Sequence, residues 1–62
     1  MNTLSDVRFA YSNKLRQAIN AGNVQAARDY QSKLDAVLQL IDWKGASAAF
    51  TNSDATLILK AA

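Results

Sequence analysis

The clearest pattern along the chain is a set of apolar residues that recur at steps of three and four between Asn23 and Trp43. At about 100° per residue these positions fall on one side of an α-helix, which is typical of a helix that packs against a neighbour. Asn23 can cap the start, because its side chain can accept from a free backbone N–H of the first turn. Gly45 can end the helix. The pattern therefore predicts a helix over residues 23–44, with an apolar stripe of Ala27, Tyr30, Leu34, Val37, Leu38 and Ile41.

A second apolar stripe precedes this one and predicts a helix over residues 3–20. Thr3 and Asp6 match the capping pattern of a helix start, with the acid favourably placed in the first turn. The two predicted helices are joined by a very short connection, in which Gly22 can adopt the left-handed conformation that closes a helix. A connection of this length makes the helices antiparallel neighbours. The stripe expected to face the second helix consists of Leu4, Val7, Tyr11, Leu15 and Ala18, with Ile19 at its edge.

The second predicted helix carries another apolar line, Ala36, Leu40 and Trp43, on a different side. A helix that is apolar on two sides is covered by more than one neighbour. We therefore expect the apolar tail, residues 45–62, to fold over Leu40 and Trp43. The open alternative for Trp43 is that another chain covers it.

The tail is compatible with two local structures. Asn52 or Ser53 can cap a short helix that has Asp54 in its first turn. Residues 55–59 also suit a strand, because Thr56–Leu59 has high β-propensity, and this strand would pair with residues 48–50 in a β-hairpin around Asn52 and Ser53. We favour the helix, because an isolated two-stranded hairpin is marginally stable in water. The predicted fold is therefore all-α: a single small domain formed by an antiparallel helical hairpin and a short C-terminal third segment.

The amino-acid composition excludes most of the usual catalytic mechanisms. The 62 residues contain no His, no Cys and no Glu, so the usual general base and the best nucleophile are missing. Disulfides are excluded, and the usual zinc ligands are absent. Asp35 and Asp42 lie one heptad apart on the second helix, which is more typical of a solvated face than of a metal site. We expect no enzymatic activity, no metal and no cofactor.

The apolar residues exceed what one hairpin can bury. Phe9 points away from the stripe of the first helix, among Ser5, Asn13 and Arg16. A chain of this length buries only about 60% of its unfolded surface, so small domains often rely on a partner subunit. Large apolar surface and exposed aromatic residues are typical of protein interfaces. We expect partner contacts through the surplus apolar residues Phe9, Leu40, Trp43, Phe50 and Leu57.

The function that follows is assembly through helix-mediated protein–protein contacts, as a homo-oligomer or as a subunit of a larger particle such as a phage virion. In size and architecture the predicted hairpin is similar to small plasmid and phage proteins that dimerise into four-helix bundles. This resemblance concerns architecture alone and transfers no functional residue. An inhibitor that docks on a host enzyme is an open alternative.

A second alternative is a small regulatory protein that binds nucleic acid. The net charge is +2, and the positive excess lies on the first helix at Arg8, Lys14 and Arg16. Three basic side chains would give weak, salt-sensitive phosphate contacts, with Phe9 available to stack on a base. The N-terminal residues lack the basic and apolar regions of a signal peptide, and no apolar run approaches the length of a membrane span. We expect a location in the cytoplasm or within a viral particle, away from membranes.

Overall fold

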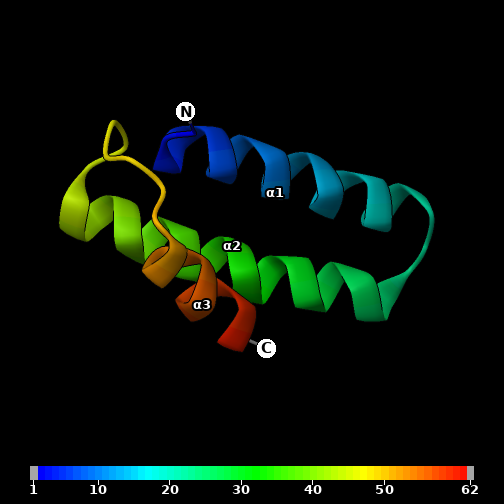
Figure 1. Cartoon of the computed structure of the whole chain (residues 1–62). Coiled ribbons are helices and arrows are strands. Elements are labelled where there is room, and N and C mark those ends of the chain that lie inside the picture. Colours follow the sequence, from blue (N-terminus) through cyan, green and yellow to red (C-terminus); the bar gives the residue numbers. More distant parts are fainter. Residues whose placement is uncertain (1, 62) are drawn as a thin grey trace.

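A computed structural model describes residues 2–61 and shows three helices joined by short connections (Figure 1). They are α1 (Leu4–Asn20), α2 (Val24–Lys44) and α3 (Asn52–Lys60). The predicted all-α hairpin with a short third segment is confirmed. The alternative β-hairpin in the tail is wrong, because this part of the described chain forms α3. Met1 and Ala62, the last residue of the predicted tail, lie outside the described residues.

The hairpin turn follows from two residues. Gly22 has a φ of 71°, in the left-handed region that favours glycine. The side chain of Asn23 then accepts a hydrogen bond of 3.1 Å from the Ala26 N–H and caps α2. The turn brings α1 and α2 together as antiparallel neighbours, with the Tyr11 and Tyr30 rings in contact at 6.3 Å between their centroids.

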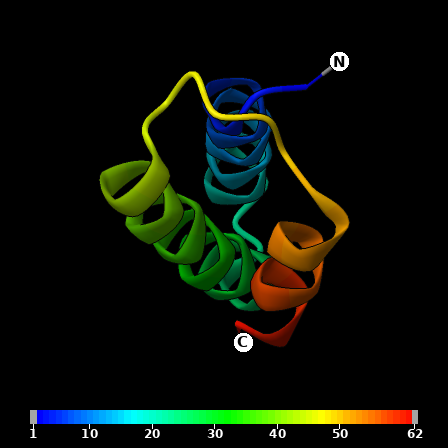
Figure 2. The ribbon, with the colours of Figure 1, turned by 60° about the vertical axis from the view of Figure 1, so that its left-hand side comes forward.

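The linker from Gly45 to Thr51 passes over the start of α1 (Figure 2). The carbonyl oxygen of Ala48 accepts from the Leu4 N–H at 2.9 Å, and that of Ala46 accepts from the Ser5 N–H at 3.0 Å. These N–H groups belong to the first turn of α1 and have no partner within the helix. The linker therefore completes the N-terminal end of α1, while the Thr3–Asp6 capping box satisfies the next donor.

The start of α3 repeats the capping arrangement of α1. The Thr51 hydroxyl accepts from the Asp54 N–H at 3.2 Å, and the Asp54 carboxylate accepts from the Thr51 N–H at 3.2 Å. The N-cap is thus Thr51, and the prediction of Asn52 or Ser53 at this position is wrong. The sequence signal was present, since Thr51 and Asp54 have the same spacing as Thr3 and Asp6.

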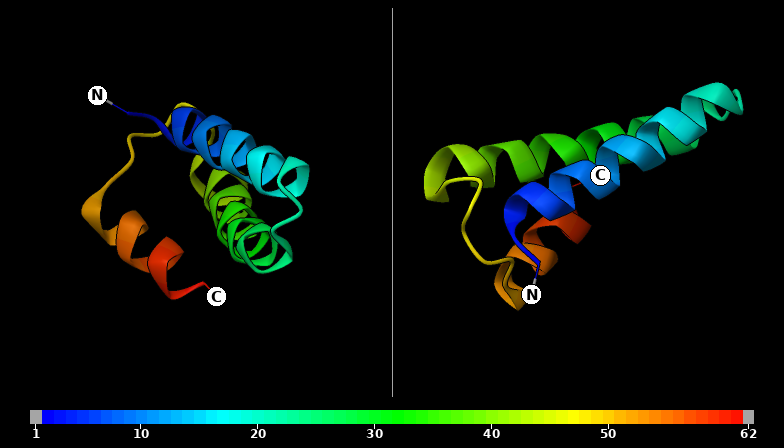
Figure 3. Two further views of the ribbon diagram at one scale, coloured as in Figure 1. Left: turned by 90° about the vertical axis from the view of Figure 1, so that its right-hand side faces the viewer. Right: turned by 90° about the horizontal axis from the view of Figure 1, so that it is seen from above.

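The core lies where the first half of α1, the second half of α2 and α3 meet. Its buried side chains are Leu4, Val7, Val37, Leu40 and Ile58. Against it pack the partly buried Tyr11, Ala36, Ile41, Ala48 and Phe50. Because α3 is short and lies beside the C-terminal half of α2, it leaves the tip of the hairpin uncovered (Figures 1 and 3).

Candidate contact surfaces

Large apolar side chains are at least as numerous on the surface as in the core. Among residues 2–61 the buried apolar residues are Leu4, Val7, Ala18, Val37, Leu40 and Ile58. The exposed large apolar residues are Phe9, Ile19, Val24, Leu38, Trp43, Leu57 and Leu59. Isolated exposed apolar residues are ordinary, so their grouping on the helices decides whether they form contact surfaces.

Phe9 lies on the outer side of α1, and its side chain is 70% exposed. It borders a shallow hollow together with Ser5, Arg8 and Ser12. Phe9 is two residues from Val7, which is buried, and this spacing turns its side chain by about 160° from the core. Phe9 is therefore available to another molecule, as its position in the sequence predicts.

Trp43 lies near the end of α2, and its side chain is 75% exposed. The expectation that the tail covers Trp43 is wrong, whereas the same expectation for Leu40 is confirmed. The physical reason is the direction in which α3 starts. Asp54 of α3 pairs with Lys44, which points about 100° away from Trp43 around α2. One face of the indole is nevertheless occupied, because the Lys44 ammonium lies 5.5 Å from its ring centroid.

Leu57 is exposed on α3 and borders a groove between α3 and α2. The α2 side of this groove includes Ala36 and Gln39. Gln39 is one turn before Trp43, so Leu57 and Trp43 lie along the same edge of the molecule. We call this pair the α2–α3 edge.

Two of the five predicted contact residues belong to the interior. Leu40 is buried under α3, and Phe50 is half-buried against the core. Phe50 is held there by the backbone, because its N–H donates to the Asn2 carbonyl at 2.9 Å. Within the folded chain these two side chains contribute to stability. Their apolar character in the sequence does not distinguish the core from a contact surface.

The side of the hairpin away from α3 carries a further apolar group that sequence reasoning did not single out. Ile19, Val24 and Leu38 are exposed there. Ile19 and Val24 border a groove of about 630 Å³ at the hairpin tip, together with Leu15 and Ala27. Leu38 was expected to face α1, yet it lies at the rim of that contact. We call Ile19, Val24 and Leu38 the open face.

The predicted basic residues do not form one patch. Arg8 lies beside Phe9, whereas Lys14 borders a groove on the α3 side of the hairpin with Tyr11 and Phe50. Arg16 is exposed, and helical spacing places it about 160° from Lys14 around α1. Arg8 and Arg16 are eight residues apart, about 80° around the helix, so these two charges share one side of α1 while Lys14 lies on another.

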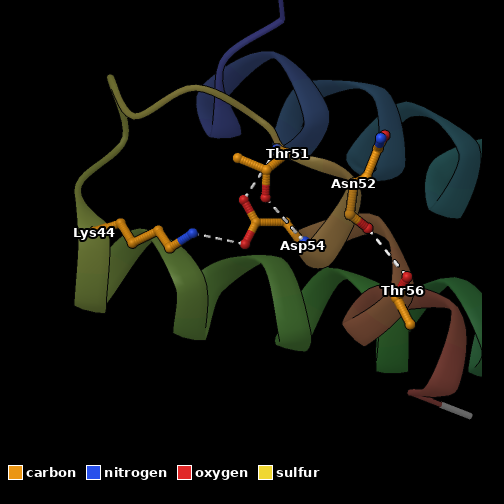
Figure 4. Close-up of polar contacts among 5 residues, drawn as sticks. All are labelled: Lys44, Thr51, Asn52, Asp54 and Thr56. Carbon is orange, nitrogen blue, oxygen red and sulfur yellow. Dashed lines mark hydrogen bonds and ion pairs between the residues drawn. The ribbon is translucent and has the colours of Figure 1, made fainter.

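An ion pair between α2 and α3 was also missed. The Lys44 Nζ lies 2.9 Å from Asp54 Oδ1, while Asp54 Oδ2 accepts from the Thr51 N–H (Figure 4). The Asp54 side chain is 1% exposed and that of Lys44 is 30% exposed. The hydrogen bond from Lys44, with those from Thr51, lowers the pKa of Asp54 despite its burial. This pair fixes the α2–α3 junction and presents no free group for chemistry.

Comparison with protein-family models, with curated proteins and with solved structures gave no match for this chain. No helix among the described residues is both long enough and apolar enough to cross a membrane. In residues 2–61 no three potential metal-ligating side chains lie together.

Proposed function

We propose that this protein is a non-enzymatic assembly subunit that associates with copies of itself through apolar side chains on its helices. The observation that carries the proposal is the surplus of exposed apolar residues in so small a chain. Among residues 2–61 these side chains lie on separate sides: Phe9 on α1, the open face of the hairpin, and the α2–α3 edge. Separate contact surfaces suit a subunit that meets more than one neighbour, as in a larger particle such as a virion.

The nature of these residues supports contact with protein. Trp43 and Phe9 are aromatic, and aromatic side chains are the usual anchors of protein interfaces. Both are attached to long helices that are fixed by the core, so little conformational entropy is lost when they bind. Charge gives the nucleic-acid alternative weaker support, because only Arg8 and Arg16 share a side of α1 and Lys14 points elsewhere.

Substitution of single exposed side chains tests the proposal. We expect Phe9→Ala and Trp43→Ala each to lower the average solution mass at high protein concentration. Arg16→Ala is the matched control, since it shortens an exposed side chain of α1 without removing an apolar anchor. Circular dichroism should show the same helix content in all four proteins. Association that is unchanged in both apolar variants would overturn the assignment of these residues, and a wild type that stays monomeric would overturn self-assembly.

A further inference from the structure

Val24 and Leu38 of the open face belong to a line of regularly spaced residues along α2. Positions 24, 28, 31, 35, 38 and 42 recur at steps of four and three, and every one of them is exposed. Only Val24 and Leu38 of these positions are apolar, whereas the other four are polar, so packing of a second helix along this line depends on matching charges as well as on apolar contacts. This line lies about 160° around α2 from Leu40, the residue that α3 covers. Among residues 2–61 no other helix covers this side of α2, although Asp35 at its edge also borders the groove between α2 and α3.

We propose, resting on the assembly function above, that the open face pairs with the open face of a second copy across a two-fold axis. The α2 helices of the two copies would run antiparallel. The residues that would contact the second copy are Val24, Arg28, Asp35 and Leu38, with Ile19 of α1 beside Val24 at the hairpin tip.

The order of these residues makes the line complementary to itself. In an antiparallel pair whose axis passes α2 between Gln31 and Ser32, Arg28 of one copy lies opposite Asp35 of the other. Both pairs form at once, because a two-fold contact is made by the same patch on each copy. The same axis places Leu38 of each copy within one residue of the level of Val24 of the other. One symmetry operation therefore matches both the charges and the apolar residues.

The extent of the face is of the order that a second copy would need. The Cα trace measures 33 × 19 × 18 Å, so the outline of one long side covers roughly 600 Å², below but of the same order as the roughly 800 Å² per partner that stable interfaces bury. Leu15, Ala27 and Leu34 are half-buried at the α1–α2 contact. A second hairpin on the open face would complete their burial, as in a four-helix bundle.

Charge reversal and restoration test this arrangement. Arg28→Asp and Asp35→Arg each place like charges opposite one another at two symmetric positions, and each should weaken dimerisation by roughly tenfold or more. The double variant Arg28→Asp/Asp35→Arg restores opposite charges and should return to within about threefold of the wild type. Lys14→Asp is the matched control, because its charge change lies on the α3 side of the hairpin. Sedimentation equilibrium measures the dissociation constants, and circular dichroism confirms the helix content.

The possible results distinguish a failure of the proposed interface from a failure of the assembly function. Recovery in the double variant supports the pairing. If the wild type associates but the two single variants associate equally well, the open face is not the interface, and assembly occurs elsewhere. If the single variants are weakened and the double variant is not restored, the proposed Arg28–Asp35 pairing is overturned. A wild type that is monomeric at all concentrations overturns both the pairing and self-assembly.

Discussion

The Lys44 ammonium lies 2.9 Å from Asp54 Oδ1 and joins the last residue of α2 to the first turn of α3. The same carboxylate caps α3 through the Thr51 N–H, so one side chain both starts the helix and attaches it. A helix of nine residues is too short to be stable alone in water. Its stability must come from this junction and from the packing of Ile58 in the core.

The junction predicts acid sensitivity. The Lys44 hydrogen bond lowers the pKa of Asp54 below its ordinary value of 3.8. The folded chain therefore binds a proton at Asp54 less readily than the unfolded chain does. The resulting stabilisation is present above the ordinary value and is lost as the pH falls through the lowered pKa. Thermal unfolding from neutral pH to about pH 2 should show this loss.

Asp54→Asn provides the control for this measurement. The amide keeps the shape of the side chain but removes the charge that Lys44 meets, so the variant should melt at a lower temperature at neutral pH. Its melting temperature should also fall less than that of the wild type as the pH is lowered. If the melting temperatures of Asp54→Asn and the wild type fell equally with pH, other carboxylates would cause the loss of stability. Asp42→Asn, a substitution at an exposed position, is the matched control and should melt like the wild type at every pH.

Leu40 and Trp43 give a second prediction, because they lie one turn apart on α2 with opposite environments. Leu40→Ala should cost about 2–5 kcal/mol of unfolding free energy, since it leaves a cavity under α3. Trp43→Ala should change the unfolding free energy by about 0.5 kcal/mol or less, as is usual at exposed positions. Urea unfolding of both variants measures the difference. Equal costs would show that Trp43 is covered in solution.

The sequence predicts the helices well because their determinants are local. The apolar stripes, Gly22 and the cap at Asn23 act within a few residues of where they stand. The placement of α3 depends on contacts between distant segments, such as the Ala48 carbonyl on the Leu4 N–H and Asp54 on Lys44. Those contacts turn α3 away from Trp43, which the apolar pattern alone could not show. The pattern did place Phe9 outward and Leu40 beneath the tail, but it could not show that Phe50 is half-buried against the core.

The distribution of Arg8, Lys14 and Arg16 on α1 gives a third prediction. Because only Arg8 and Arg16 share a side of the helix, too few charges face one phosphate backbone for tight binding, and we expect no shift of single-stranded or duplex nucleic acid by micromolar protein at low salt. A gel-shift assay measures this. A complex that forms at low salt and weakens in Arg8→Ala and Arg16→Ala would instead favour nucleic-acid binding through α1.

The most direct test of the assembly proposal is the solution mass of the wild-type protein by light scattering over about a hundredfold range of concentration, which detects association whose dissociation constant falls within or below that range. We expect the average mass to rise from that of one chain to that of two chains or more, because the open face, Phe9 and the α2–α3 edge remain uncovered in a single copy. A mass that stays at one chain over the whole range would contradict the proposal.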